Sequence, residues 1–140
     1  MPIDPRVSVF RSVPAVLGEG AVWHPARQSL FWVDILGRKI HETGPDGCTI
    51  DIEGNLWIAH WSGWGVTRWD PVRGRLLDTL RLPAAQVTTC TFGGPQLDTF
   101  FITTASCKLT DAERQAQPEA GFVFAANVGT RGFSTDVFAG

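Results

Sequence analysis

DIEGNLWIAHW, at residues 51–61, carries the pattern from which the architecture of this chain can be read. A turn rich in Asp, Glu, Gly and Asn leads directly into a strand of Leu, Trp and aliphatic residues. Matching Leu30, Leu56 and Phe100 separates three such copies by 26 and then by 44 residues. Only the longer separation suits a four-stranded propeller blade of roughly 40–50 residues, so the short one indicates that chain is missing after the first copy. The two other copies are HPARQSLFWVDI (24–35) and FGGPQLDTFFITTA (92–105).

The composition is that of a soluble globular domain, because 140 residues that are 44% hydrophobic and 19% charged can form one sizeable core. The net charge of −2 and the scattered arginines argue against a nucleic-acid partner, since phosphate binding needs Lys and Arg gathered on one face. No run approaches the roughly 18 apolar residues that span a bilayer, and the N-terminus lacks the apolar segment of a signal peptide. We therefore expect a cytoplasmic protein with no nucleic-acid and no membrane partner.

The three cysteines, Cys48, Cys90 and Cys107, form no CxxC pair and lie in or beside strand-like sequence. Their odd number and their surroundings favour buried free thiols over disulfides or zinc ligands.

Short runs of Val, Ile, Thr, Phe and Trp alternate with Gly, Pro, Asp and Asn clusters, which is typical of an all-β protein. The second copy belongs to a complete four-stranded unit, whereas the first unit runs through residues 43–47 into it and lacks a fourth strand. The first strand can pair with the last unit, as ring-closing strands do. Twelve strands, enough for three blades, are predicted near 7–10, 20–24, 29–35, 38–42, 47–51, 56–61, 65–70, 76–82, 87–92, 99–105, 121–126 and 133–138.

One helix is predicted, over TDAERQAQ at residues 110–117. Thr110 and Glu113 have the spacing of a capping box, and Pro118 ends the segment. We expect one or two helical turns inserted at the surface of the last blade.

Six stretches together resemble the SMP-30/gluconolactonase/LRE family of regucalcin-like proteins and sugar lactonases. The resemblance covers nearly the whole chain and implies a six-bladed β-propeller with one divalent cation in its central channel. Six blades require roughly 240–300 residues. The chain therefore resembles a shortened member: an all-β, truncated propeller of about three four-stranded blades, a single partial domain over 1–140 with an internal deletion near 43–45. The stretches are LGEGAVWHP (17–25), LFWVDILGRKIH (30–41), GPDGCTIDIEGNLWIAHW (44–61), VTRWDPVRGRLL (66–77), LPAAQVTTCTFGGPQLDTFFITTAS (82–106) and AGFVFAANVGTRG (120–132).

The resemblance also implies metal-dependent hydrolysis of sugar lactones such as gluconolactone or arabinonolactone. A lactone is a cyclic ester, so its hydrolysis needs a cation that polarises the carbonyl and a base that activates water. By the family's pattern, Glu19 in LGEG is a metal ligand, and Asp46 in GPDG is both a metal ligand and the catalytic base. The cation would be Ca²⁺, Zn²⁺, Mg²⁺ or Mn²⁺. The family's mid-chain asparagines have no counterpart, because the chain has only Asn55 and Asn127.

Other interpretations stay open. The chain could be an inactive or binding-only propeller remnant with an incomplete metal site, and both Glu19 and Asp46 could be ordinary turn carboxylates. Uncovered blade faces would favour self-association, most simply as a two-fold dimer. No substrate-binding residue is assigned, although Trp61 and Trp64 flank a Gly-containing turn and could stack on a sugar. Isolated His24, His41 and His60 are weak metal candidates, and no dinucleotide-binding, HExxH or nucleophile-elbow motif is complete.

Overall fold

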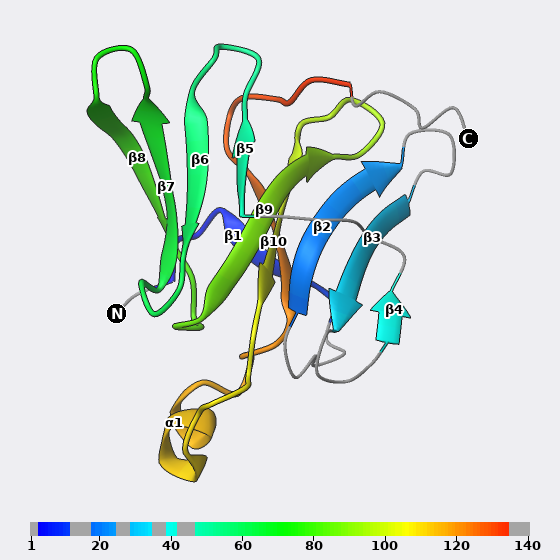
Figure 1. Cartoon of the computed structure of the whole chain (residues 1–140), viewed down its shortest axis with the longest axis vertical. Coiled ribbons are helices and arrows are strands. Elements are labelled where there is room, and N and C mark those ends of the chain that lie inside the picture. The colour runs from blue at the N-terminus through cyan, green and yellow to red at the C-terminus, as the bar shows by residue number, and fades with distance from the viewer. Residues whose placement is uncertain (1–2, 12–17, 25–28, 35–38, 42–46, 135–140) are drawn as a thin grey trace.

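The computed structural model describes residues 3–11, 18–24, 29–34, 39–41 and 47–134, with side chains described at 3–10 and 47–134. In this part of the chain, eleven strands form three antiparallel sheets that stand side by side (Figure 1). The complete unit expected from the sequence is a four-stranded meander in chain order. It consists of β5 (Cys48–Ile50), β6 (Leu56–His60), β7 (Gly65–Asp70) and β8 (Arg75–Arg81).

The last sheet is completed by the first strand of the chain. The strands β9 (Val87–Gly93), β10 (Thr99–Thr104) and β11 (Val123–Asn127) follow one another, and β1 (Val7–Arg11) adds to the edge of β11. Val7 lies opposite Ala126 in this antiparallel pair. The expected ring-closing pairing is therefore confirmed, and it joins the two ends of the described chain in one sheet.

The first unit is a three-stranded sheet of β2 (Gly18–His24), β3 (Ser29–Asp34) and β4 (Lys39–His41). Its expected lack of a fourth strand is confirmed among the residues that the structure describes. The strand β2 lies against both β9 and β10, whereas β9 also lies against β5 and β6. The order in space is thus the β5–β8 sheet, then the last sheet, then the β2–β4 sheet.

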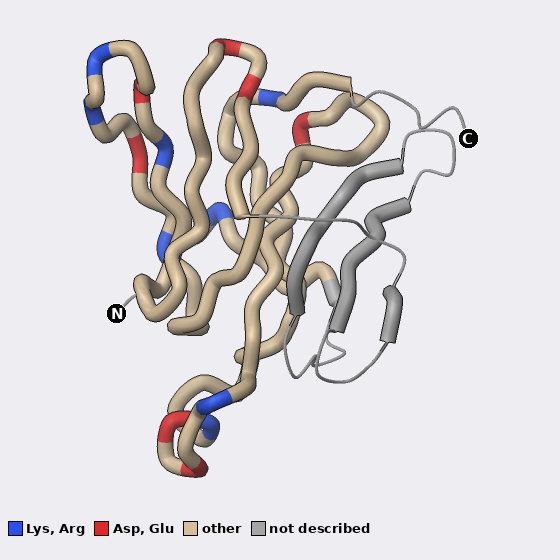
Figure 2. Tube along the Cα trace, viewed as in Figure 1, with Lys and Arg blue, Asp and Glu red and all other residues tan. Residues whose placement is uncertain are grey.

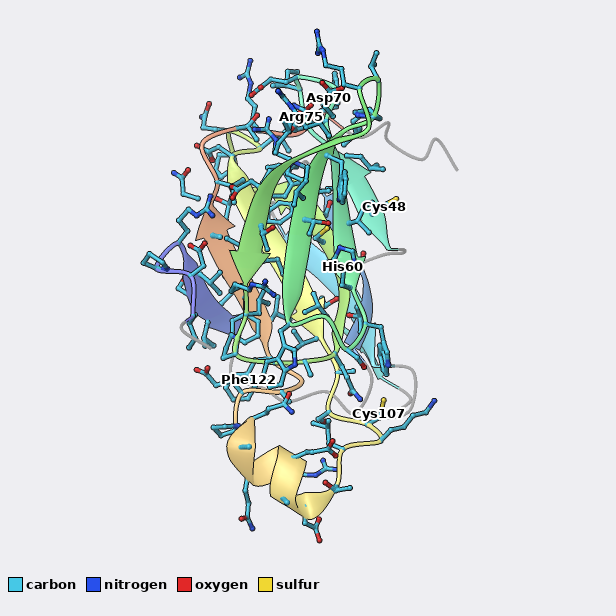
Figure 3. The ribbon with its side chains drawn as sticks, turned by 90° about the vertical axis from the view of Figure 1, so that its left-hand side faces the viewer. Cys48, His60, Asp70, Arg75, Cys107 and Phe122 are labelled. Carbon is cyan, nitrogen blue, oxygen red and sulfur yellow. The ribbon has the colours of Figure 1, made fainter. Side chains whose placement is uncertain are left out.

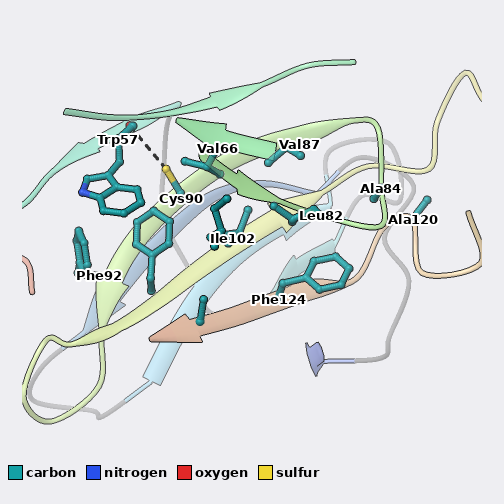
Figure 4. Packing of buried hydrophobic residues seen from close by; sticks show 13 residues of the cluster. Trp57, Val66, Leu82, Ala84, Val87, Cys90, Phe92, Ile102, Ala120 and Phe124 are labelled. Carbon is teal, nitrogen blue, oxygen red and sulfur yellow. Dashed lines mark hydrogen bonds between the residues drawn. The ribbon is translucent and has the colours of Figure 1, made fainter. Parts of the chain in front are cut away.

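The described core lies between the β5–β8 sheet and the last sheet (Figure 4). Trp57 in β6 is fully buried and contacts Phe92 and Phe100, with ring centroids 5.9 and 4.6 Å away. Cys90 lies in the same layer, with its Sγ 3.7 Å from the Trp57 carbonyl oxygen. Burial raises the pKa of the Cys90 thiol, which is therefore a neutral packing group. Aromatic rings that pack edge to face across two sheets fix how the sheets lie on each other.

A buried carboxylate organises the turn that precedes β6. Asp51 is fully buried, and its Oδ1 accepts the backbone N–H groups of Glu53 and Asn55, both at 3.0 Å. Its Oδ2 accepts Trp57 Nε1–H at 2.9 Å and Arg68 Nε–H at 2.8 Å. Burial, the largest influence, raises the pKa of Asp51, but these hydrogen bonds together outweigh it and lower the pKa overall. The DIEGNLW motif is thus a turn held to its own strand by one ionised side chain.

The helix α1 (Asp111–Ala116) is inserted between β10 and β11, as expected. Thr110 accepts the Glu113 N–H, and the Glu113 carboxylate accepts the Thr110 N–H at 2.7 Å, so the capping box is confirmed. No residue within α1 is buried. The helix projects from one end of the sheets, as Figure 1 shows.

The expected strand at 133–138 is wrong in its described part, since Phe133 and Ser134 lie in no strand and 135–138 fall outside the described residues. The edge of β11 where that strand would add is occupied by β1. The chain crosses instead to the neighbouring sheet, where Gly132 bridges Asp51 and the Arg131 carbonyl accepts the Ile52 N–H at 2.8 Å.

The cysteine prediction holds in part. All three cysteines are free, and Cys90 and Cys107 are buried, but Cys48 is exposed. The expectation of burial was wrong for Cys48 because it lies on the face of the β5–β8 sheet that turns away from the last sheet.

Candidate functional site

Each of the three sheets has an inner edge strand, which is β2, β5 or β9. The direction of these strands distinguishes the two ends of the molecule. Each lies at an edge of its sheet, and both β2 and β5 lie against β9. Their arrows point the same way in Figure 1, where β2 and β9 begin near the lower end of the sheets and β5 begins higher, opposite Ile58 in the middle of β6. The N-terminal ends of β2 and β9 thus mark the lower end of that view. We call this the entry end. It is also the end from which α1 projects.

Of the two site residues expected from the sequence, one lies in an inner strand and the other precedes one in the sequence. Glu19 is the second residue of β2, where its backbone pairs with Val33 of β3. Asp46 lies outside the described residues, directly before Gly47 and two positions before β5. The side chain of Glu19 is likewise outside the described part. The strands β2 and β5 therefore run in the same direction on either side of β9, with the start of β2 at the entry end and the start of β5 farther along β9.

The two asparagines lie elsewhere. Asn55 directly precedes β6, which runs antiparallel to β5, and Asn127 ends β11, which runs parallel to β9. Both backbone positions are therefore at the end opposite the entry end. Neither asparagine replaces the missing mid-chain ligands of the family pattern.

A residue that the sequence reasoning missed lies at the entry end of β9. Gln86 directly precedes β9 and is only 5% exposed. Its backbone carbonyl accepts the Ala105 N–H at 2.9 Å, but its side-chain Oε1 has no hydrogen-bond partner within the part of the chain that the structure describes. A buried amide oxygen without a partner is costly, so a group that donates to it or binds it would stabilise this site. The signal in the sequence is the position of Gln86 relative to its strand. Gln86 stands one residue before an inner strand, Asp46 stands two residues before another, and Glu19 is the second residue of the third.

The α1 insertion is tied to the same linker. Gln117, which follows α1, is buried, and its Oε1 accepts the Ala85 N–H at 2.7 Å. On the other side of the insertion, Thr104 Oγ1 donates to the Phe122 carbonyl at 2.8 Å and accepts the Gly121 N–H at 3.0 Å. These bonds hold the base of the insertion beside Gln86.

Two tryptophans border the entry end. Trp61 and Trp64 lie in the turn between β6 and β7, which is at this end because β6 runs antiparallel to β5. Trp61 is 46% exposed, and Trp64 has a left-handed backbone with φ +58°. The Trp64 carbonyl accepts the Leu82 N–H at 2.9 Å, so the turn is bonded to the linker that leads to β9. An exposed indole ring at this place offers an apolar surface on which a sugar ring can stack.

The donor types at the entry end suit a hard divalent cation, which prefers carboxylate and amide oxygens. Glu19 and Asp46 are carboxylate residues in the sequence, and Gln86 has a buried amide oxygen with no hydrogen-bond partner among the described residues. His60 is not part of this set, because its Nε2 lies 2.6 Å from Thr67 Oγ1 within the β5–β8 sheet. Among the residues that the structure describes, no three His, Cys, Asp or Glu side chains converge on a common point.

Comparison with known proteins decides the family. The family model described as SMP-30/Gluconolactonase/LRE-like region matches residues 17–44 and 41–106, which is more than half of the chain. The chain belongs to this family. The resemblance carried by LGEG, GPDG and DIEGNLW is thereby confirmed.

This chain is similar to known regucalcins and to a sugar lactone lactonase, and it covers a different share of each relative. A regucalcin of Danio rerio is 43% identical over 164 aligned residues, which cover 99% of this chain and 55% of the relative. YvrE of Bacillus subtilis, whose name describes it as a sugar lactone lactonase, is 44% identical over 96 residues, which cover 69% of this chain and 33% of the relative. The chain thus spans from about a third to just over half of the relatives' length.

A solved structure shows the fold. The calcium-binding protein regucalcin of Agrobacterium tumefaciens superposes with a TM-score of 0.62 at 21% identity, over 87% of this chain and 49% of the solved one. The three sheets therefore have the architecture of half of a regucalcin-type propeller, and the shortened propeller expected from the sequence is confirmed. No helix in the described part of the chain has the length and apolarity of a membrane span.

Proposed function

We propose that this chain hydrolyses sugar lactones, such as gluconolactone or arabinonolactone, with one divalent cation at the entry end. Glu19 and Asp46 would hold the cation, which is Ca²⁺, Zn²⁺, Mg²⁺ or Mn²⁺, and Gln86 would offer it an amide oxygen. The observation that carries the proposal is that Glu19 in LGEG begins β2 and Asp46 in GPDG precedes β5, in a chain of the gluconolactonase family.

The bound cation would supply Lewis acidity to the lactone carbonyl. Asp46, as a carboxylate, accepts a proton from water, and the water oxygen bonds to the carbonyl carbon. The ring C–O bond then breaks, and its oxygen takes a proton to leave an open-chain hydroxy acid. Trp61, exposed at the entry end, provides an apolar face for the sugar ring.

The proposed activity is tested by following acid release from gluconolactone with and without a chelator. General-base catalysis typically contributes about 10²–10⁴-fold, so Asp46→Asn should remove most of the turnover at any metal concentration. Glu19→Gln should mainly raise the metal concentration that half-saturates the activity, because it removes one ligand and leaves the base.

Asp98→Asn is the matched control, since Asp98 is an exposed aspartate that precedes β10 at the end opposite the entry end. It should keep wild-type turnover. Hydrolysis that the chelator leaves unchanged, or an Asp46→Asn variant as active as wild type, would contradict the mechanism.

A binding-only remnant is the second candidate, and one observation favours it. Both asparagines lie at the end opposite Glu19, so only two of the three ligands in the family pattern come from matching residues. A remnant would bind metal weakly and release no acid. Isothermal titration with Ca²⁺ and Mn²⁺, beside the hydrolysis assay, separates the two candidates.

We infer further that the chain forms one partial propeller domain with an internal deletion near residues 43–45. The two segments matched by the family model meet at 41–44, which supports this place for the missing chain. The order of the sheets also supports it, because the β2–β4 sheet and the β5–β8 sheet lie on opposite sides of the last sheet although they are consecutive in sequence.

A further inference from the structure

One face of the β5–β8 sheet is apolar, and no described element covers it. Strand pairing puts Ile50, Leu56, Trp69 and Leu76 in one row across the four strands. Ile50 is 46% exposed and Leu76 is 47% exposed, whereas Trp57 on the opposite face is fully buried. Figure 3 views this sheet face on, with Cys48 and His60 on its surface. We call it the outer face.

Three polar groups near the middle of the outer face bond to one another. Thr67 Oγ1 lies 2.6 Å from His60 Nε2 and accepts Trp69 Nε1–H at 2.8 Å. The strands β5 and β6 contain no charged residue, and Figure 2 shows charges mainly at the hairpin tips of this sheet. Apart from the exposed Arg81, which pairs with Gly65 at one end of the sheet, little polar surface would lose water unpaired if the face were covered. The rest of the face is suited to contact with another apolar surface.

The β2–β4 sheet, at the other end of the row of sheets, also has large apolar residues. In the β2–β4 sheet, the pairing register assigns Trp23, Leu30 and Trp32 to one face, and Val22, Phe31 and Val33 to the other. Each face thus holds three large apolar residues, together with Glu19 on the Val33 face and with Asp34, Lys39 and His41 on the Trp32 face. One face is accounted for by the last sheet, against which β2 lies. Large apolar residues on the remaining face are stabilised when another surface covers them.

We propose that the outer face of the β5–β8 sheet binds the free face of the β2–β4 sheet of a second copy of this chain. The chain covers 49% of a solved regucalcin, so a second copy supplies a body of the size that is missing. Two such contacts, related by a two-fold axis along the inner strands, close a ring with no exposed sheet face. Glu19 and Asp46 of both copies then belong to the same end of one ring.

The proposal is tested on the full chain by sedimentation velocity at micromolar concentrations. Wild type should sediment as a dimer of the 15.3 kDa chain. Ile50→Lys and Leu76→Lys place a charge on the outer face and should each raise the dimer dissociation constant about tenfold or more, because the charge is desolvated on binding. Val72→Lys is the matched control, since Val72 is apolar and 90% exposed but lies in the turn between β7 and β8.

A monomeric wild type, open-ended larger oligomers, or a Val72→Lys variant as weak as the face variants would overturn the proposal. Hydrogen exchange at high and low concentration identifies the surface that the outer face meets. Dimerisation should protect amides in both 29–41 and 48–60. Protection in 48–60 alone would mean that the outer face binds itself and would also overturn the proposal. Neither measurement depends on lactone hydrolysis, so this inference and the proposed function can fail separately.

Discussion

Asp51 shows how much of this fold rests on single side chains. Its carboxylate holds the turn before β6, the indole of Trp57 and the guanidinium of Arg68, whose Nη2 lies 2.7 Å from Asp51 Oδ2. Arg68 also lies over the Trp57 ring, 5.5 Å from its centroid. The buried charge of Asp51 is compensated by Arg68. Replacing Asp51 with an uncharged residue therefore leaves the Arg68 guanidinium without its most buried partner.

We predict that Asp51→Ala lowers the free energy of unfolding by about 3–5 kcal/mol, the range for breaking a buried ion pair by removing one partner. Asp98→Asn, at an exposed position, should change it by about 0.5 kcal/mol or less. Urea unfolding followed by Trp fluorescence measures both. Equal midpoints for the two variants would show that the Asp51 contacts add nothing to stability.

At the scale of elements, β1 depends on Arg6 as well as on its pairing with β11. Arg6 Nη1 lies 2.6 Å from Asp78 Oδ2 in β8, and Arg6 Nη2 lies 2.7 Å from Asp4 Oδ2. The Asp4 N–H also donates to the Arg81 carbonyl at 3.2 Å. The residues before β1 therefore tie the closing strand of the last sheet to the outermost strand of the neighbouring one.

Arg6→Ala should therefore destabilise the protein by about 1 kcal/mol, because charge-assisted hydrogen bonds stabilise but these side chains are partly screened by water. Arg73→Ala removes a local and solvent-exposed Arg–Asp pair and should leave the urea midpoint almost unchanged. High salt should reduce the difference between wild type and Arg6→Ala. A salt-independent difference would indicate lost packing of the Arg6 stem instead.

At the scale of the whole molecule, several carboxylates that join its parts are ionised more readily than usual. The hydrogen bond from Arg6 is the main reason why the pKa of Asp78 and the pKa of Asp4 are lowered. Asp51, although burial raises its pKa, also has a lowered pKa overall because of its hydrogen bonds. A carboxylate whose folded pKa is depressed stabilises the fold above its unfolded pKa, about 3.9, and loses that contribution as the pH falls through the folded pKa.

We expect the urea midpoint of wild type to decrease as the pH falls below about 4, with no comparable loss from these groups between about pH 5 and 7. The decrease should be smaller in Arg6→Ala, because that variant no longer lowers the pKa of Asp4 and Asp78. Urea titrations at a series of pH values test this. A midpoint that rises in acid, or the same acid dependence in both proteins, would contradict it.

The sequence by itself determined the elements. The runs of aromatic, β-branched and aliphatic residues in β6 and β10, the turn chemistry of DIEGNLW and the capping box at Thr110 depend on neighbours within a few residues, so local chemistry is enough to predict them. The resemblance in LGEG and GPDG also named Glu19 and Asp46 as site candidates. Those two assignments stay predictions.

Only the tertiary structure decided which elements meet. The sequence predicted both that the first strand pairs with the last unit and that residues 133–138 form a strand there, but the edge of β11 takes only one strand, and the structure decided that it is β1. The same holds for Gln86, whose side-chain Oε1 is buried with no partner among the described residues, and for Cys48, whose exposure follows from a sheet face that no described element covers. Burial is a property of what the rest of the chain places over a residue, so it is settled only when the sheets pack.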